Sequence, residues 1–518
     1  MIFRFRISLL HRARRWRQWL HNQRPHDAMN ATASPQVLEG ETGIVTGAKG
    51  YLLELEGLPS VHVNDVIANA SGYRALVTAI SEKGVEALLL EHERPRLGDR
   101  FVLRTRGIRL YRGEKLFGRV INALGDPIDG NGALPSADSA LHLESIARGM
   151  HARAPMTAQF ATGITAVDVL LPLAKGQRQM VIGPLSSGKR EFLEGLFTHQ
   201  KEAGTVCIYS FIGRPASYIE GMVPRLLKPE GNPHTIILAT FSNEPAPMTY
   251  LAPSVATEIA EFFSESGRDV LLVFDDLGTH AKYVREIALL SGRIPGRESY
   301  PGDLFFQQAR LLERGGYFNE TAGGGSITIL PVLETNIEDI SNLVSTNLIS
   351  ATDGHLFFSP LLHAEGYFPA IEAQQSVTRV GRQTQSLLAT QLSIMVRSLL
   401  AEYNRQRRYS QFGTQLSKET RDTITKGEIM HVFLQQNAAE AVSLPAQIVL
   451  LALVLTPLFH EKEVMFATRN RATLVTAIDT AQPLAYLKAM AAEGTVPLTS
   501  FLKKLEEALP YFESVWQP

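Results

Sequence analysis

The amino-acid sequence predicts a multidomain α/β protein with a small N-terminal β-barrel, a central parallel-sheet domain and a C-terminal α-helical domain. Its 518 residues are too many for one ordinary core, since a domain typically holds about 100–200 residues. The middle of the chain alternates apolar runs with helix-length segments, which is typical of a parallel sheet. After residue 382, apolar residues recur at helical spacing and glycine becomes rare. We expect the barrel over 37–104, the sheet domain over 105–386 and the helical domain over 387–518.

Charge and cysteine content exclude several classes of protein. Lys and Arg together number 51 and Asp and Glu 52, so no excess of positive charge predicts a nucleic-acid partner. The single cysteine, Cys207, excludes an intrachain disulfide framework and a cysteine-based zinc cluster, and it favours a reducing compartment. The longest apolar run, 448–455, lies within a stretch, 441–459, that contains two prolines, and the run is shorter than the roughly 20 residues that a bilayer span requires. We expect it to form a buried helix.

Residues 1–36 are predicted to be a basic N-terminal extension. Seven arginines precede the first acidic residue, Asp27, and aromatic residues are interleaved with them. Three interpretations are open. The segment is a transit peptide, a class that is Arg-rich and acid-poor but usually also Ser-rich; or it is an amphipathic helix that docks on a partner or on anionic lipid; or it lies upstream of a true start at Met29.

The two domains before the helical region are predicted from local patterns. Short alternating apolar stretches, punctuated by Gly and Asp, run from about residue 40 to residue 102 and predict a small barrel. The segment 118–132 packs several turn signals around a short apolar run and predicts an ordered loop that leads into the second domain. Helix-length segments separate the apolar runs of that domain, so βαβ crossovers and a mostly parallel sheet follow. The expected strands are 179–182, 206–211, 234–238, 270–274 and 327–333.

The motif GPLSSGKR follows the first of these strands and precedes a helical stretch. Its GxxxxGK spacing is that of a P-loop, in which backbone N–H groups surround phosphate oxygens, the helix N-terminus adds positive potential, and the lysine reaches the β- and γ-phosphates. The alternative is a glycine-rich turn without a ligand. We assign nucleotide contacts to Gly183, Pro184, Leu185, Ser186, Ser187, Gly188, Lys189 and Arg190.

Two positions bear on whether the site binds a metal ion. The residue after a P-loop lysine is normally Ser or Thr, whose hydroxyl ligates Mg²⁺, but here it is Arg190. A guanidinium has no lone pair to offer and repels a divalent cation, so it counts against Mg²⁺. The apolar strand 271–274 ends in Asp275 and Asp276, which is a weak signal alone because strands often end in Asp at turns. Together the motifs favour a P-loop (RecA-like) domain with Asp275 as the candidate metal ligand.

The chain resembles subunits of F-type ATP synthases over nearly all residues after about 40. The segments GDPIDGNG, GQRQMVIG, SGRIPGRESYPGDLFFQQARLLER and SVTRVG occur in the order of that family. Three segments discriminate between its subunits, because PGRESYPGDLFFQQARLLER, LETNIEDISNLVSTN and SVTRVG resemble the alpha subunit rather than the catalytic beta subunit. The resemblance is therefore to a divergent alpha subunit with a degenerate P-loop.

Several positions depart from the family pattern. Where the beta subunit has a glutamate that activates the attacking water, and the alpha subunit a glutamine, this chain has Arg214, which cannot accept a proton. The GDRQTGKT of alpha subunits has become GPLSSGKR, and the GIRPA loop has lost its arginine at 366–370. The glutamine pair that borders the base in the family corresponds loosely to Gln435 and Gln436. These changes imply that ATP or ADP binds weakly, or not at all, at this chain's own site.

Arg379 of SVTRVG is the candidate catalytic residue. In the family this arginine crosses the subunit interface and contacts the γ-phosphate in the neighbouring beta site. The alternative is a surface arginine in a charged loop. The resemblance thus implies a non-catalytic subunit that supplies Arg379 in trans and has no ATPase activity of its own.

The resemblance also implies partners and a location. The partners are a catalytic beta-type subunit in an alternating hetero-hexamer, a central-stalk gamma subunit and a peripheral-stalk subunit. The location is the cytoplasmic face of a bacterial inner membrane, reached only through the Fo sector, which transports H⁺ or Na⁺. Two other functions are open: a self-sufficient hexameric motor of the secretion or Rho type, against which Arg190 and Arg214 argue, and a structural paralogue that binds no nucleotide.

Overall fold

The computed structural model describes residues 41–515, except residues 94, 138, 142, 144, 336–340, 411–417 and 460–461. The extension expected at 1–36 lies outside the described residues. The chain divides into two compact units, each built from several segments. The domain boundaries expected at 36, 104 and 386 stay predictions. The first unit comprises Met1–Pro155, Gly176–Ile182 and Gln200–Asp353, and the second comprises Met156–Lys175, Gly183–His199 and Gly354–Pro518.

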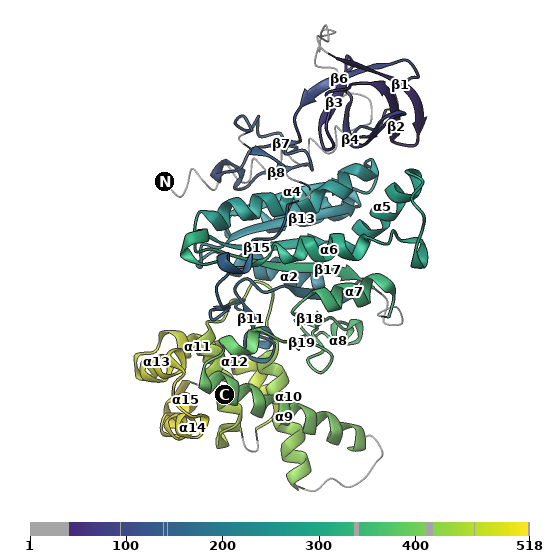
Figure 1. Ribbon diagram of the computed structural model, residues 1–518. Helices are drawn as coiled ribbons and strands as arrows, with labels where there is room; N and C mark the ends of the chain where they lie inside the picture. The colour runs from purple at the N-terminus through teal and green to yellow at the C-terminus, as the bar shows by residue number, and fades with distance from the viewer. Residues whose placement is uncertain are drawn as a thin grey trace. The chain divides into compact units, whose positions relative to one another are not determined.

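A closed β-barrel begins the described part of the first unit and is drawn in purple in Figure 1. Its antiparallel strands follow the order β1-β2-β5-β4-β3-β6. Because successive side chains point to opposite faces of a strand, alternate residues such as Leu53, Ala87 and Phe101 fill the interior. The alternating pattern therefore predicted this barrel correctly. The strands are β1 (Thr42–Lys49), β2 (Leu52–Gly57), β3 (Val66–Asn69), β4 (Arg74–Ser81), β5 (Gly84–Leu89) and β6 (Arg100–Thr105).

A mostly parallel sheet forms the core of the first unit. Strand β13 lies between β14 and β15, β15 pairs with β17, and β14 pairs with β8, all in parallel. Every residue of β13 and β14 is buried, as expected for central parallel strands that are covered on both faces. Each expected strand is present, although β14 begins one residue later than predicted. The strands are β8 (Val120–Ile121), β12 (Gln179–Gly183), β13 (Val206–Arg214), β14 (Thr235–Phe241), β15 (Asp269–Asp275) and β17 (Ser326–Glu334).

Helices connect these strands, and α4 packs against β13, β14 and β15. The short antiparallel pair β7 (Arg109–Leu110) and β9 (Ser139–Ala140) lies in the segment between the barrel and β12, and β16 (Gly316–Tyr317) pairs with β17. The alternation of strand and helix confirms the predicted α/β class of this part of the chain. The helices are α3 (Ala216–Leu226), α4 (Ala246–Glu265), α5 (Leu277–Leu290), α6 (Leu304–Glu313) and α7 (Leu343–Ala351).

A buried ion pair orders the turn-rich segment 118–132. Arg119 donates from Nε to Asp129 Oδ2 over 2.6 Å and from Nη2 to Asp129 Oδ1 over 2.9 Å. The backbone N–H groups of Val120 and Asn131 donate to the same carboxylate. Burial alone would raise the pKa of Asp129, but Arg119 and these N–H groups hold it below its usual value. The loop is thus ordered by the buried Arg119–Asp129 pair as well as by its turn residues.

The second unit is mainly helical, as predicted for the C-terminal region. Helix α2 begins at the lysine of the GxxxxGK motif, and the other α-helices lie after residue 354. Two short antiparallel strand pairs belong to the same unit, β10 (Gln159–Phe160) with β11 (Leu173–Ala174) and β18 (Gly354–Phe357) with β19 (Val377–Thr378). The helices are α2 (Lys189–His199), α8 (Pro360–Ala364), α9 (Leu387–Ser410), α10 (Lys418–Leu434), α11 (Leu444–Val454), α12 (Val464–Thr480), α13 (Ala485–Glu493), α14 (Leu498–Glu507) and α15 (Leu509–Val515).

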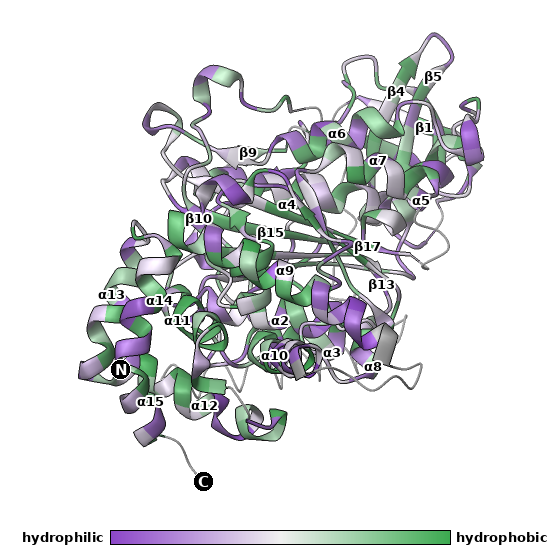
Figure 2. Ribbon diagram, turned by 90° about the horizontal axis from the view of Figure 1, so that it is seen from below, coloured by the Kyte–Doolittle hydropathy of each residue, from purple (hydrophilic) through white to green (hydrophobic). Residues whose placement is uncertain are grey.

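Helix α11 is the buried helix that the apolar run predicted. Ser443 caps its N-terminus by accepting a hydrogen bond from Ala446 N, and every residue from Ala446 to Val454 is buried. Most of the helix is coloured as hydrophobic in Figure 2. It packs against α9, α10, α12, α13 and α14, so it has no polar face. Among the described residues, no helix combines the length and apolar composition needed to cross a bilayer.

We expect Leu451→Ala to destabilise the helical unit by about 2–5 kcal/mol, because Leu451 is fully buried and its truncation leaves a cavity in α11's packing. Unfolding by urea, followed by circular dichroism, should show a lower midpoint. The matched control is Met465→Ala on α12, whose side chain is 59% exposed and whose truncation should change stability by less than about 0.5 kcal/mol. Equal effects of the two substitutions would contradict the central position of α11.

Candidate functional site

The predicted phosphate-binding residues form one tight turn between β12 and α2. Gly188 has φ +83°, which favours glycine, and a Cβ there would lie 2.9 Å from His363 Cδ2. A Cβ at Gly183 would lie 2.6 Å from the Phe358 carbonyl oxygen, so this position is also confined. Both glycines of GxxxxGK are therefore required by the local packing. The turn ends at Lys189, which is the first residue of α2.

The side chain of Lys189 forms hydrogen bonds within its own turn. Its buried Nζ donates to the carbonyl oxygens of Gly183 (2.7 Å) and Pro184 (2.5 Å) and to Ser187 Oγ (3.2 Å). Ser187 Oγ in turn donates to the Pro184 carbonyl over 2.7 Å. A phosphate would have to compete with these internal acceptors for the ammonium group. Leu185, at the outer side of the turn, is 71% exposed, so an apolar side chain stands where alpha subunits carry an arginine.

A second cluster of candidate residues lies in the first unit, at the ends of adjacent strands. Arg214 ends β13 and Asp275 ends β15, and the parallel register places Phe211 opposite Asp275. Arg214 Nε donates to Asp275 Oδ1 over 3.0 Å, and Nη2 donates to the same oxygen. Tyr209 donates from its hydroxyl to Asp275 Oδ2 over 2.8 Å, and Arg214 Nη1 lies 3.0 Å from Glu334 Oε2.

This cluster is shielded from water. The side chain of Arg214 is 8% exposed and that of Asp275 only 1%. Burial alone would lower the pKa of Arg214, but Asp275, Asp276 and Glu334 raise it above its ordinary value. Burial raises the pKa of Asp276 to about 6, despite the nearby Arg214. Arg214 is therefore a permanent cation, and both oxygens of Asp275 already accept hydrogen bonds from the protein.

The donor groups present do not suit a Mg²⁺ ion. Mg²⁺ prefers oxygen ligands in octahedral geometry, yet Arg190 occupies the position of the usual hydroxyl, and a guanidinium neutralises Asp275. The described residues also include no group of three or more His, Cys, Asp and Glu side chains placed to hold a metal. The role of Asp275 as a metal ligand thus stays a prediction, and its contacts count against it.

The backbone on both sides of Arg379 is held in place, and the Arg379 side chain is exposed. Thr378 Oγ1 donates to the Pro172 carbonyl over 2.8 Å, and Gly381 lies so close to the same carbonyl that no side chain would fit there. These contacts fix the chain on both sides of Arg379. Its side chain is exposed and has no ion pair within the described part of the chain. Burial lowers the pKa of His355, and the charge of Arg379 lowers it further.

The two candidate base-contacting glutamines have different environments. Gln436 is buried, and its Oε1 accepts from Thr165 N and Oγ1 while its Nε2 donates to the carbonyl oxygens of Gly163 and Glu440. Its hydrogen-bonding positions are thus used within the chain, and its contacts are structural. Gln435 instead lines a cavity of about 560 Å³ in the second unit. Contact of either glutamine with a base stays a prediction.

Sequence reasoning identified Arg214 only as a residue that cannot act as a base. It missed the partners of Arg214, namely Tyr209, Glu334 and the carboxylate of Asp275. A signal did exist, because Glu334 ends the strand next to β15, and the carboxyl ends of neighbouring parallel strands meet at one edge of a sheet. A lone arginine at the end of β13 therefore had acidic neighbours to pair with.

The fold and the GxxxxGK turn define a nucleotide-binding protein of the P-loop class, and the comparison with protein families agrees. Residues 163–378 match the nucleotide-binding domain of the ATP synthase alpha/beta family, and residues 385–510 match the C-terminal domain of the ATP synthase alpha/beta chain. Both matches lie in the part of the chain where the family segments were found.

Individual relatives narrow the class further. The chain is 36% identical to ATP synthase subunit alpha 2 of Nitrosospira multiformis over 429 residues, which are 83% of this chain and 84% of the relative. It is 34% identical to ATP synthase subunit alpha 1 of Chlorobium luteolum over 421 residues, 81% and 82% of the two chains. It is 36% identical to ATP synthase subunit alpha 2 of Syntrophotalea carbinolica over 419 residues, 81% and 80%. This chain belongs to the alpha subunits of the F-type ATP synthase family, and the resemblance is confirmed.

Arg214→Gln, which restores the residue of the alpha pattern, should destabilise the sheet by about 3–5 kcal/mol, because it leaves the Asp275 charge buried without a cation. Adding Asp275→Asn should recover part of that loss, since the amide carries no charge. Arg421→Gln on the exposed side of α10 is the control and should cost less than about 0.5 kcal/mol. Additive effects of the Arg214 and Asp275 substitutions in a double-mutant cycle would show that the pair is not coupled.

Proposed function

We propose that this chain is a non-catalytic alpha subunit of a rotary F1Fo ATP synthase or ATPase, and that it supplies Arg379 in trans to the catalytic site of a beta-type partner. The observation that carries the proposal is the burial of Arg214 between Asp275 and Glu334. Arg214 stands where the catalytic subunits carry the water-activating glutamate, and a permanently charged guanidinium cannot take a proton from water. The chain's own site therefore has no general base at this position.

The proposed assembly follows from the family. The chain alternates with beta subunits in a hetero-hexamer around a central-stalk gamma subunit, and a peripheral stalk contacts the ring. The complex lies on the cytoplasmic face of a bacterial inner membrane and couples ATP synthesis or hydrolysis to H⁺ or Na⁺ transport in the Fo sector. A self-sufficient motor would need the base and the metal hydroxyl that Arg214 and Arg190 replace.

Arg379 has the properties that a trans-acting arginine needs. Its backbone is fixed by Thr378 and Gly381 against the Pro172 carbonyl, so the side chain starts from a defined point. Its guanidinium is exposed and forms no ion pair with the described residues, so it does not have to break a bond inside its own subunit to reach a phosphate. A planar guanidinium can then bridge two phosphate oxygens.

The chain's own nucleotide site is proposed to bind ATP or ADP weakly and without Mg²⁺. Lys189 is engaged by loop carbonyls, and Arg190 places a fixed positive charge where the metal ligand would stand. Since a cation next to a helix N-terminus attracts phosphate oxygens directly, Arg190 takes over part of the charge that Mg²⁺ normally contributes. Asp275, paired with Arg214, offers no free carboxylate to the metal.

In the assembled ring, Arg379→Ala should lower kcat about a thousandfold or more, while assembly and nucleotide affinity at the beta site stay nearly unchanged. The reason is that a trans-acting arginine stabilises the transferring phosphoryl group more than the bound substrate. ATP hydrolysis by the purified ring, at saturating MgATP, is the measurement. Arg379→Lys should restore little activity, because an ammonium group cannot reproduce the planar fork.

The control for Arg379 is Arg382→Ala, an exposed arginine on the next turn of the chain. It should leave kcat within about twofold, as expected for an exposed surface charge without a role in phosphoryl transfer. The chain purified without its partner should hydrolyse ATP no faster than the background rate. The proposal fails if the lone chain is an active ATPase, or if the Arg379→Ala ring turns over normally.

Arg190→Thr should increase the Mg²⁺ dependence of nucleotide binding to the isolated chain, because a hydroxyl ligand replaces a repelling cation. Calorimetric titration with ATP, with and without EDTA, measures the effect. Combining it with Arg214→Gln should increase the dependence further, since Asp275 is then released. Lys189→Ala is the control that should abolish binding in every background. Tight ATP binding by the unmodified chain that EDTA abolishes would contradict the role given to Arg190.

A further inference from the structure

The strands β18 and β19 form a short ladder with one buried face and one exposed face. They pair antiparallel, with His355 opposite Val377. Leu356 and Thr378 belong to the buried face, being 0% and 6% exposed, whereas Val377 is 39% exposed. Because successive side chains of a strand point to opposite faces, His355 shares the exposed face with Val377. Arg379 directly follows β19 and comes two residues after Val377, which places it diagonally across from His355, within reach of a long side chain.

His355 is hydrogen-bonded to the chain that leads into Arg379. Its Nε2 lies 2.8 Å from the carbonyl oxygen of Gln375. A carbonyl oxygen accepts and cannot donate, so Nε2 carries the hydrogen of this bond. Burial lowers the pKa of His355 more than the bond to Gln375 raises it, and the charge of Arg379 lowers it further. The imidazole is therefore neutral at physiological pH, and the effect of Arg379 agrees with the closeness of the two side chains.

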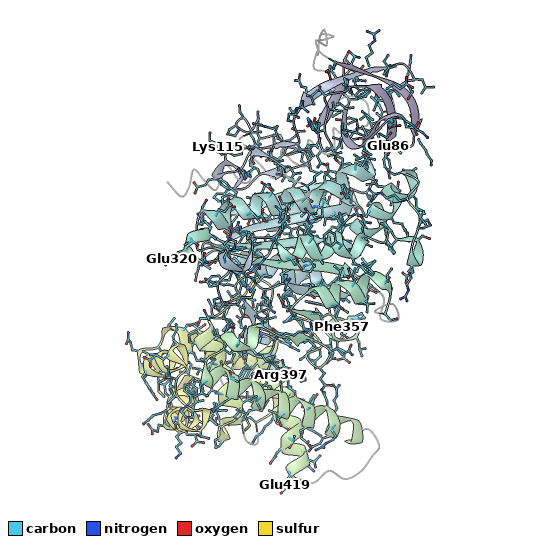
Figure 3. The ribbon with its side chains drawn as sticks, in the orientation of Figure 1. Glu86, Lys115, Glu320, Phe357, Arg397 and Glu419 are labelled. Atoms are coloured by element: carbon cyan, nitrogen blue, oxygen red, sulfur yellow. The ribbon has the colours of Figure 1, made fainter. Side chains whose placement is uncertain are left out.

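Other contacts hold the buried side of the same segment. Ser376 Oγ accepts a hydrogen bond over 2.9 Å from the backbone N–H of Phe357, the last residue of β18, which is labelled in Figure 3. The same Oγ donates to the Glu372 carbonyl over 2.8 Å. These bonds do not involve His355, so we expect the segment to keep its path when that side chain is replaced. The bond from His355 adds a restraint on the exposed side, where Gln375 itself is exposed.

Such a restraint matters for an arginine that acts outside its own subunit. The side chain of Arg379 is exposed, and an exposed arginine keeps many rotamers, so the direction of its guanidinium depends on how firmly its backbone is held. A displacement of about 1 Å at a group that acts on a reacting atom can lower a rate about a hundredfold. The neutral ring of His355 can lie beside the guanidinium without repelling it, because it carries no charge.

We propose that His355 is a positioning residue for Arg379: its Nε2–H bond to the Gln375 carbonyl fixes the exposed edge of the chain that carries the arginine. The inference rests on the proposed trans-acting role of Arg379. His355 acts on the rate through Arg379 and does not itself contact the nucleotide, so its loss lowers kcat and leaves nucleotide affinity at the beta site unchanged. The alternative is that His355 serves only the packing of β18, in which case its replacement changes stability but not the turnover of an assembled ring.

The test compares His355→Gln with His355→Asn in the assembled ring at saturating MgATP. The amide nitrogen of Gln reaches about the position of Nε2 and can donate to the Gln375 carbonyl, whereas Asn is one methylene shorter and cannot. His355→Asn should lower kcat about ten- to hundredfold and leave the KM for ATP within about twofold. His355→Gln should stay within about threefold of the unmodified kcat. If the Asn variant does not assemble, His355→Phe, which keeps a ring without a donor, should show the same loss.

Two further rings complete the experiment. Tyr486→Phe is the matched control, because it removes a side-chain bond to a backbone carbonyl between α13 and α14 of the same unit, and it should leave kcat within about twofold. The double variant His355→Asn with Arg379→Ala should turn over no more slowly than Arg379→Ala alone, because His355 acts only through that arginine.

Equal kcat values for the His355→Asn and His355→Gln rings overturn the proposal, as does a further loss of activity in the double variant. The two levels of the argument fail separately. Normal turnover of the Arg379→Ala ring defeats the proposed function itself. Normal turnover of the His355→Asn ring beside an impaired Arg379→Ala ring defeats only the role given to His355.

Discussion

The pairing of Arg214 with Asp275 is the constraint on which the chemistry of this protein depends. Two charges at the ends of neighbouring parallel strands are buried together, and neither could stay in the interior without the other. Tyr209 and Glu334 complete the cluster, so both oxygens of Asp275 and each nitrogen of the Arg214 guanidinium have a partner. At this edge of the sheet, Asp275 therefore has an internal counter-ion.

Burial assigns different roles to the arginines of this chain. Arg214 is buried among carboxylates and can only hold structure in place, whereas Arg379 is exposed on a fixed backbone and can act on another molecule. Arg397 lies between these cases, since it is half-buried, bonded to one carbonyl and without an acidic partner in the described part of the chain. Three guanidinium groups of equal chemistry are thus distinguished by what surrounds each of them.

The turn at 183–190 also fits the proposed role of a non-catalytic subunit. Packing against His363 and Phe358 leaves no room for side chains at Gly188 and Gly183, independently of any ligand. The side chains that would handle phosphate and metal have changed, and the lysine bonds to its own loop. A loop that is needed for packing can therefore keep its shape while its chemistry is lost, which is consistent with a subunit that acts on its neighbour's nucleotide.

The sequence by itself determined the barrel, the parallel strands, the buried helix α11 and the family, because each depends on local periodicity or on contiguous motifs that survive without knowledge of contacts. It also aligned Arg190, Arg214 and Arg379 with family positions that carry the metal ligand, the general base and the trans-acting arginine. Only the tertiary structure decided what these residues touch: the parallel register of β13 and β15 sets Arg214 against Asp275, and the packing of α9 and α10 with the segment 362–374 encloses Arg397 and His431 in one cavity. Such contacts join residues far apart in the chain, and strand register and helix packing, which no local pattern encodes, bring them together.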